Sequence, residues 1–258
     1  MEMNQENKMM NAPKDVVDEA IKVSEGKVRK PFAKLLVSAM LAGFLIGLGY
    51  YGYLILAGGS VNGLPYLGKT LGAFVFPIGL VIIILAGGDL FTGNCLITFG
   101  WLAKKYRLRD VFKNWGVVYL GNLMGALVLV SLLFSSQVIT GNVEMYILDI
   151  ATSKVELTFL EALARGILCN ILVSLAVYLT FAAKTVGGKI AGAILPVVLF
   201  VISGYEHSVA NMFLLPFAKI LGSSITIGQI LMNLLPVTIG NIIGGAIIVP
   251  FAYSFIHK

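Results

Sequence analysis

The segment SGYEHSVANMFLLP, residues 203–216, places a glutamate and a histidine in the middle of an apolar stretch. The apolar runs around it, Ile190–Tyr205 and Ser208–Ala218, are each too short to cross a hydrocarbon core of roughly 30 Å as a helix. Because a backbone inside lipid must satisfy its own hydrogen bonds, we interpret the two runs as the halves of one broken membrane helix. Ionisable side chains at such a break are costly and are typical of functional sites.

A second break of the same character lies earlier in the chain, in GDLFTGN, residues 88–94. It separates the apolar runs Leu71–Gly88 and Leu90–Ala103 and carries Asp89. Four further runs are long enough to span a membrane singly: Leu35–Ala57, Trp115–Gln137, Leu157–Ala183 and Ile230–Ile256. These patterns predict an all-α integral membrane protein with six transmembrane helices, of which spans 2 and 5 are broken.

The amino-acid composition supports this fold class. With 58% hydrophobic and 12% charged residues and a mean hydropathy of +0.90, the chain is neither an ordinary soluble protein nor a disordered one. Its two cysteines, Cys95 and Cys169, both lie inside apolar runs, which excludes a disulfide scaffold. The two histidines, His207 and His257, are too few for a haem or multinuclear metal site, and we expect no cofactor.

The net charge of +6 does not indicate a nucleic-acid partner, because the 19 Lys and Arg residues form no single basic patch. Most of them lie before the first span, between spans 2 and 3, between spans 4 and 5, and at the end of the chain. The positive-inside rule therefore predicts that both termini of this multi-pass protein are cytoplasmic, with the spans surrounded by the lipid of the plasma membrane.

The sequence also contains an internal repeat. When the sequence is compared with itself at an offset of 119 residues, a glycine, a proline and a GNxxG run each align with identical residues. The aligned residues are Gly47 with Gly166, Pro77 with Pro196, and Gly121, Asn122 and Gly125 with Gly240, Asn241 and Gly244. At the same offset GDLFTGN falls on HSVANMF, residues 207–213. Each repeat holds three spans, so the second copy enters the membrane from the opposite face, which predicts an inverted 3+3 repeat with a site at the midplane.

The N-terminal residues 1–30 differ from the rest of the chain, residues 31–258, which we expect to form one transmembrane domain. Ala12–Lys27 places apolar residues at helical spacing among alternating charges: Val16, Val17, Ala20, Ile21 and Val23. The pattern indicates a short amphipathic helix on the cytoplasmic membrane face. Two interpretations remain open, a solvated lead-in and a lid that gates a pathway.

Four segments resemble the signature motifs of the formate/nitrite transporter family: GDLFTGN (88–94), KNWGVVYLGNLMGAL (113–127), SGYEHSVANMFLLP (203–216) and NLLPVTIGNIIGG (233–245). The resemblance covers nearly the whole chain beyond the lead-in. It implies a homopentamer of aquaporin-like six-helix protomers, each with its own channel for small monovalent anions of weak acids, namely formate, nitrite or hydrosulfide.

His207 is the expected proton donor to such an anion. A desolvated ion is expensive in an apolar constriction, and protonation removes that cost. An imidazole, with an ordinary pKa of about 6.5, can give up and recover a proton, and Glu206 is expected to orient or reprotonate it. The resemblance assigns further residues: Thr92 on a mobile loop opposite the histidine, Asn170 and Asn211 near the pore lining, and Phe76, Leu80, Leu90 and Phe200 at two apolar constrictions.

Two cations near the start of span 4 call for separate interpretations. Lys154, in a segment expected on the outer side, would attract anions, and the family pattern has a lysine here. Arg165 departs from that pattern. It follows Glu161 by four residues, so we expect an internal ion pair, or a contact between protomers, rather than a role in the pore.

Alternative functions have weaker support in the sequence. An aquaporin-like pore for small neutral solutes would carry paired Asn-Pro-Ala motifs, and an integral membrane enzyme would need clustered catalytic groups; neither is present. GLPYLGKT, residues 63–70, fits a phosphate-binding loop pattern but lies in a predicted outer loop without the required strand. Gly43 and Gly47 have a spacing typical of close helix packing. The small residues Gly93 and Cys95, which lie beside Thr92 in the sequence, favour a soft anion such as hydrosulfide.

Overall fold

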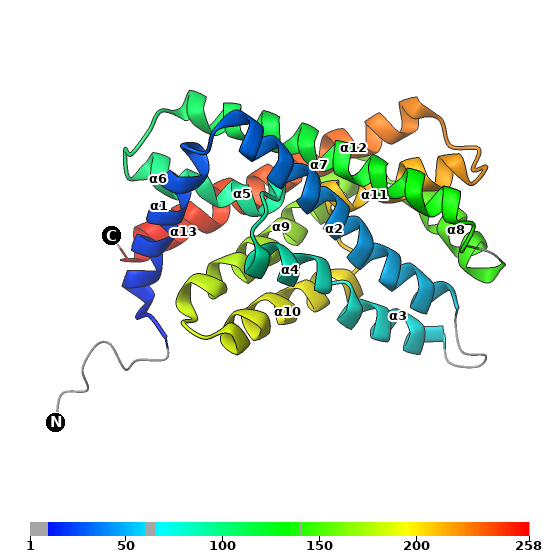
Figure 1. The fold of residues 1–258 in the computed structure, drawn as a ribbon, viewed down its shortest axis with the longest axis horizontal. Helices are drawn as coiled ribbons and strands as arrows, with labels where there is room; N and C mark the ends of the chain where they lie inside the picture. Colours follow the sequence, from blue (N-terminus) through cyan, green and yellow to red (C-terminus); the bar gives the residue numbers. More distant parts are fainter. Residues whose placement is uncertain (1–9, 60–64, 140, 258) are drawn as a thin grey trace.

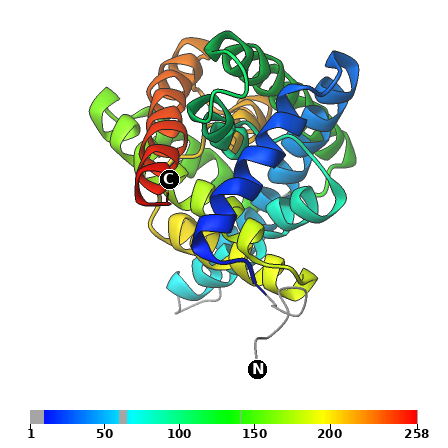
Figure 2. The ribbon, with the colours of Figure 1, turned by 90° about the vertical axis from the view of Figure 1, so that its left-hand side faces the viewer.

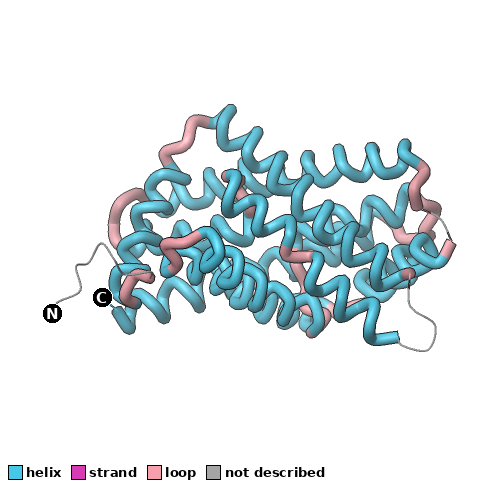
Figure 3. Tube along the Cα trace, turned by 60° about the horizontal axis from the view of Figure 1, so that its bottom comes forward, coloured by secondary structure: helices cyan, strands magenta, loops and turns pink. Residues whose placement is uncertain are grey.

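The computed structural model describes residues 10–59, 65–139 and 141–257, and nearly all of them are helical (Figure 1, Figure 3). The first half contains α1 (Pro13–Val28), α2 (Phe32–Gly58), α3 (Pro65–Val75), α4 (Ile78–Ala86), α5 (Phe91–Asn94), the 3-10 helix η2 (Cys95–Ile97), α6 (Thr98–Leu102) and α7 (Leu108–Ser136). The second half contains α8 (Asn142–Val155), α9 (Phe159–Ala182), α10 (Val186–Ile202), α11 (Ser208–Ile220), α12 (Ile227–Ile242), the π-helix η3 (Ile243–Ile248) and α13 (Val249–His257).

Among the described residues, five helical segments are long and apolar enough to cross a membrane. They are Phe32–Gly58, Tyr66–Ala86, Leu108–Ser136, Phe159–Ala182 and Ile227–His257. Two shorter apolar helices, α10 and α11, accompany them. Large apolar side chains such as Leu41, Phe74 and Leu195 are exposed on the outer faces of these helices, as expected where lipid or another protomer covers them.

The helical conformation is interrupted at two places inside apolar segments. Between α4 and α5 the chain turns at Gly87, whose φ of 92° is accessible to glycine but strained for other residues, and then runs extended to Leu90. Between α10 and α11 it turns at Gly204, with φ of 67°, and runs extended to His207. Both interruptions end at the start of a new helix, so each delivers free backbone N–H groups to the interior.

Glycines in the two GNxxG runs let helices pack at backbone contact. A side chain at Gly125 of α7 would collide with the Met40 carbonyl of α2, and one at Gly244 of η3, the continuation of α12, would collide with the Ile167 carbonyl of α9. The two helix pairs therefore pack in the same way, by the close approach that small residues allow.

The same contacts correct the register of the predicted repeat. The offset of 119 relates α7 to α12, but Met40 and its counterpart Ile167 are 127 residues apart, so α2 and α9 follow a different offset. The match of Gly47 with Gly166 is a coincidence. Gly47 faces side chains of Leu129 and Phe213, whereas Gly166 packs on the backbone of α12.

Helix α1 lies across one end of the bundle beside α13, and α3 and α8 lie at the opposite end (Figure 1, Figure 2). The apolar face of α1 is buried in a cluster with residues of the helical bundle. It contains Val16, Val17, Ala20 and Ile21, which pack with Leu96, Phe99, Tyr178 and Val249. Just before α1, the Asn11 backbone N–H donates to the Ala182 carbonyl at 2.8 Å. The amphipathic helix is thus packed on the protein, and the interpretation of a solvated lead-in is wrong.

The segment that matched a phosphate-binding loop has a different structure. Pro65–Thr70 belongs to α3, while Gly63 and Leu64 lie outside the described residues. A side chain at Gly68 would collide with the carbonyl oxygen of Leu56, so this glycine allows α3 to pack on α2. The described part of the motif forms a helix rather than a loop around a phosphate.

Candidate functional site

His207 occupies the N-cap of α11 and is almost completely buried. Its Nδ1 accepts the Ala210 backbone N–H at 3.1 Å, and its Nε2 lies 2.8 Å from the Thr92 hydroxyl oxygen. Since Nδ1 acts as an acceptor, the neutral ring carries its proton on Nε2 and donates it to Thr92. The sequence-predicted pair of Thr92 and His207 is therefore in direct contact.

Thr92 lies on helix α5 rather than on a loop, and it is fully buried. The Asn170 side chain donates to the Thr92 carbonyl at 3.3 Å and to the Asn241 carbonyl at 2.6 Å. Asn170 thus holds α5 next to α12, and it lines neither of the two cavities described below. Its Oδ1 has no partner among the described residues.

Two asparagines from the GNxxG runs fix the two helix interruptions in the same way. The Asn122 Oδ1 accepts the Phe91 backbone N–H at 2.8 Å, and its Nδ2 donates to the carbonyls of Asp89 and Ala39, at 2.9 and 2.7 Å. One amide side chain therefore satisfies the first turn of α5 and the extended chain before it.

Asn241 repeats this arrangement at the second interruption. Its Oδ1 accepts the Ser208 backbone N–H at 2.9 Å, and its Nδ2 donates to the carbonyls of Glu206 and Gly166, at 3.0 and 2.8 Å. Sequence reasoning used both asparagines to recognise the repeat but missed this role. The signal was present, because a buried asparagine can satisfy backbone groups that a broken helix leaves open.

Beside His207, four polar side chains form what we call the α8 network: Lys154, Glu206, Asn211 and Asn233. The Lys154 Nζ lies 2.6 Å from the Glu206 Oε1, and Asn211 donates to the other carboxylate oxygen at 2.6 Å. Asn211 also donates to the Asn233 Oδ1 at 2.8 Å, and Asn233 donates to the Lys154 carbonyl at 2.7 Å. The structure brings three predicted residues together and adds Asn233, which the sequence analysis missed.

A counterpart, the α1 network, lies at the other interruption and consists of Lys27, Lys30, Asp89, Asn94 and Asn114. The Lys27 Nζ lies 3.0 Å from the Asp89 Oδ1 and 2.6 Å from the Asn94 Oδ1, and Lys30 pairs with the second Asp89 oxygen. Asn94 donates to Asp89 at 3.2 Å and to Asn114 at 3.0 Å, and Asn114 donates to the Lys27 carbonyl at 3.1 Å. Burial lowers the pKa of Lys27, and the nearby carboxylate opposes that shift.

The sequence analysis missed the α1 network except for the position of Asp89. Lys27 and Lys154 are 127 residues apart, whereas Asp89 and Glu206 are 117 residues apart. A search at the single offset of 119 could not align both pairs. A search that allowed a different offset for each helix would have found them.

The predicted constriction residues fall into two groups, one at each of two cavities. The α8 cavity has a volume of about 180 Å³ and is lined by Phe76, Phe200 and His207 together with the α8 network residues Lys154, Glu206 and Asn211. The Phe200 ring stacks on His207, with centroids 5.9 Å apart, and meets the edge of Phe76 at 5.4 Å. The two phenylalanines therefore cover the histidine on the side of this cavity.

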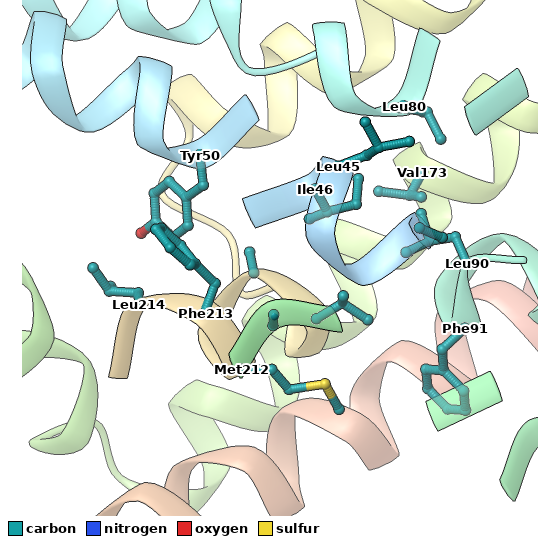
Figure 4. Close-up of a cluster of buried hydrophobic side chains, with 14 of the residues drawn as sticks. Leu45, Ile46, Tyr50, Leu80, Leu90, Phe91, Val173, Met212, Phe213 and Leu214 are labelled. Atoms are coloured by element: carbon teal, nitrogen blue, oxygen red, sulfur yellow. The ribbon is translucent and has the colours of Figure 1, made fainter. Parts of the chain in front are cut away.

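The α1 cavity is larger, about 630 Å³, and is lined by the other two predicted constriction residues, Leu80 and Leu90. Both leucines belong to the apolar core drawn in Figure 4, which also contains Val173. Lys27 and Lys30 of the α1 network line the same cavity. The contact between Thr92 and His207 belongs to the junction of α5 and α11, each of which borders one of the cavities.

The predicted ion pair between Glu161 and Arg165 is not formed. The Glu161 carboxylate instead accepts the backbone N–H and the hydroxyl of Thr158, at 2.9 and 2.7 Å, and so caps α9. Arg165 lines the α8 cavity. The expectation that this arginine has no role in the pore stays a prediction, but the residue lies at the same cavity as His207.

A family model for formate/nitrite transporters matches residues 14–255. The chain belongs to the formate/nitrite transporter family. It is 37% identical to the transporter YrhG of Bacillus subtilis over 93% of this chain and 91% of the relative. It is 34% identical to the formate channel FocA of Escherichia coli over 90% of this chain and 89% of that protein.

A solved structure of a pentameric formate channel with formate bound matches with a TM-score of 0.78 and 33% identity, over 88% of this chain and 97% of the other. This formate/nitrite transporter family member is accordingly a multi-pass membrane protein whose relatives are transporters and channels. The predicted class of transport protein is confirmed, and the membrane enzyme alternative is excluded.

Proposed function

We propose that this chain is a facilitator for small monovalent anions of weak acids, with formate as the first candidate and nitrite and hydrosulfide as further ones. The observation that carries the proposal is the buried His207 imidazole, bonded to Thr92 where two half-helices meet and bordered by the α8 cavity. The names of the relatives, formate channels, support the choice of formate.

The architecture that fits this function has six spans in an inverted 3+3 repeat. In the first repeat, α2 is span 1, α3 to α6 form span 2, which is broken at Asp89, and α7 is span 3. In the second repeat, α9 is span 4, α10 and α11 form span 5, which is broken at Glu206, and α12 to α13 form span 6. Residues 31–258 form the channel domain, and residues 1–30 lie on the cytoplasmic side, where α1 is positioned to gate the α1 cavity. The equivalent bonding of Asn122 and Asn241 supports the inversion. With both termini cytoplasmic, the α8 cavity opens to the outside of a plasma membrane.

A homopentamer is the assembly that we propose, as in the matched pentameric formate channel. The exposed apolar faces of the long helices, with Leu41 and Leu195 among their members, would be covered by lipid or by neighbouring protomers. Each protomer would hold its own conduit, because both cavities and the histidine come from one chain.

The proposed passage begins when an anion enters the α8 cavity, which the positively charged side chains of Lys154 and Arg165 line. Phe76 and Phe200 then oppose entry of a desolvated charge, which is costly in apolar surroundings. The neutral His207 ring takes up a proton from the water outside the α8 cavity, and the resulting imidazolium gives this proton to the anion. The neutral acid then passes the apolar side chains of Leu80 and Leu90 and ionises again in the water beyond, which leaves the ring neutral as before. No covalent bond to the protein is formed.

The N-cap bond of His207 keeps the ring neutral until a substrate arrives. Forming the imidazolium puts a proton on Nδ1, which then can no longer accept the Ala210 N–H. A helix N-terminus also disfavours a positive charge. An anion beside the ring offsets both costs, so protonation and substrate arrival are coupled.

The positions of the two small residues beside Thr92 make hydrosulfide a weaker candidate than formate. Gly93 lines the α1 cavity, but Cys95 is buried and lines neither cavity. Its thiol donates weakly to the Asn241 carbonyl at 3.9 Å. Cys95 therefore contributes to packing next to the conduit rather than to the surface that a passing anion would meet.

The test is flux into proteoliposomes of formate, nitrite and hydrosulfide, compared with glycerol and urea at two pH values. We expect pH-dependent anion flux that falls at least about tenfold in His207→Ala, because a general acid of this kind is worth at least that much. His257→Ala is the matched control, since that histidine stacks on Tyr253 in the last helix, away from both cavities. Glycerol or urea flux that ignores the loss of the His207 imidazole would favour an aquaporin-like pore.

A further inference from the structure

The α8 cavity holds two cationic side chains, Lys154 and Arg165, but one anionic side chain, Glu206. Lys154 and Glu206 are nearly buried and 2.6 Å apart, so seen from the cavity mouth their opposite charges largely cancel. Lys154 by itself is thus a weaker attractor for an anion than its charge suggests. The positive charge left over in this cavity belongs to Arg165.

The Arg165 guanidinium is free to interact with a ligand. Among the described residues it forms no hydrogen bond and no salt bridge; the carboxylate one turn earlier, Glu161, is held by Thr158 and interacts with Arg165 only at longer range. The Arg165 carbonyl accepts the Glu206 backbone N–H at 3.3 Å, which ties this turn of α9 to the chain that leads into His207. The side chain is only partly exposed, so its charge is less screened than that of a surface arginine.

A guanidinium also recognises shape. Its planar fork of N–H groups can bind both oxygens of one carboxylate, whereas an ammonium acts as a point charge. Formate and nitrite each present two oxygens in one plane, while hydrosulfide presents a single sulfur. A guanidinium that lines the cavity without a hydrogen-bond partner can therefore distinguish the two kinds of anion.

We propose that Arg165 is the docking cation of the α8 cavity and that it selects planar anions with two oxygens, formate and nitrite, before they reach His207. The inference rests on the proposed anion transport. It assigns a specificity role to a residue for which the sequence analysis expected no role in the pore. Lys154 and Glu206 then form a neutral pair behind the docked anion.

The test measures the initial rate of uptake into proteoliposomes against anion concentration, at low and high ionic strength, for the parent chain, Arg165→Gln and Arg165→Lys. We expect Arg165→Gln to raise the KM for formate, nitrite and hydrosulfide about tenfold at low salt, with the maximal rate unchanged, because a focused charge raises local anion concentration by at least that factor. Arg165→Lys should restore the KM fully for hydrosulfide and only in part for formate and nitrite.

Lys219→Gln is the matched control. It removes one positive charge from the same proposed side, but Lys219 is exposed and does not line the α8 cavity. We expect parent kinetics from this variant and an unchanged pentamer from every variant in size-exclusion chromatography.

Three results would overturn the inference: a KM for formate unchanged in Arg165→Gln, an equal change in Lys219→Gln, or loss of the oligomer together with flux, which would make Arg165 an assembly residue. Absence of anion flux in the parent chain would instead refute the proposed function. The two failures are therefore distinguishable.

Discussion

The α1 network and the α8 network have the same arrangement, one beside each of the two cavities. In each, an acidic residue precedes a half-helix, an asparagine in the first turns of that half-helix donates to the acid, and a lysine from a preceding helix pairs with it. A second asparagine, Asn114 or Asn233, ties the lysine backbone to the network. Because the two networks contain the same kinds of residue in the same order along the chain, their differences can be compared position by position.

The α1 network is saturated and the α8 network is not. The Asp89 carboxylate accepts hydrogen bonds from Lys27, from Lys30 and, at 2.5 Å, from the hydroxyl of Ser38. The Asn94 Oδ1 accepts a hydrogen bond from Lys27. In the α8 network the Asn211 Oδ1 has no partner among the described residues.

The residue at the half-helix N-cap differs as well, since Leu90 occupies it on the α1 side and His207 on the α8 side. The α1 network therefore serves to hold α1 against the interruption. The α8 network keeps one acceptor oxygen, that of Asn211, which under the proposed function is available to a protonated passenger.

The largest effect that separates the two networks is expected from neutralising the acids. Asp89→Asn leaves two ammonium groups without their carboxylate, and we expect a loss of about 4 kcal/mol in unfolding free energy, as for a broken buried pair. Glu206→Gln leaves one ammonium group, that of Lys154, without its carboxylate, and we expect about half that loss. Thermal unfolding in detergent measures both, and equal shifts in Tm would contradict the comparison.

Substitutions of Asn94 and Asn211 should rank in opposite order in their effects on stability and on transport. Asn94→Ala removes bonds with three side chains and should cost about 2 kcal/mol, whereas Asn211→Ala removes two and should cost about 1 kcal/mol. Formate uptake, in contrast, should fall several-fold more in Asn211→Ala, since that side chain lines the α8 cavity and orients Glu206. The same order in both measurements would remove the distinction between a structural and a functional network.

The smallest effect is expected from Lys30→Gln, which gives the α1 network one lysine and one acid, as in the α8 network. Lys30 is partly exposed, and Lys27 still pairs with Asp89, so the change should be within about 1 kcal/mol. For a chain of this size that corresponds to about 2–4 °C in Tm. A drop as large as that of Asp89→Asn would show that Lys30 is a principal partner of the acid.

Much of the candidate site could be predicted from the sequence because its signals are local. An acid and a histidine inside an apolar run, as at Glu206 and His207, are costly in lipid wherever the chain takes them, so their presence indicates function before any contact is known. The lengths of apolar runs likewise predicted four of the five long helices, whereas the fifth, Tyr66–Ala86, was expected to be half of a broken span. The amphipathic spacing predicted α1 to within a residue at either end.

Errors arose where a conclusion needed a specific partner. The spacing of Glu161 and Arg165 permits an ion pair, but the Thr158 N-cap competes for the same carboxylate and wins. The resemblance placed Thr92 on a loop, whereas the Asn122 amide stabilises the first turn of a short helix around it. In both cases a neighbouring hydrogen-bond partner decided between conformations that the sequence pattern left equal.

The sequence by itself determined that this chain is a helical membrane protein, where its helices are interrupted, and that an imidazole lies at one interruption. These follow from hydrophobic length and from the cost of polar groups in lipid, which depend on neighbouring residues in the chain. Only the tertiary structure decided which side chains meet there: Thr92 with His207, 115 residues apart, and Lys27 with Asp89, 62 residues apart. Such pairings depend on how the helices pack and on connections of unequal length between them, which shift the repeat by a different number of residues at each helix.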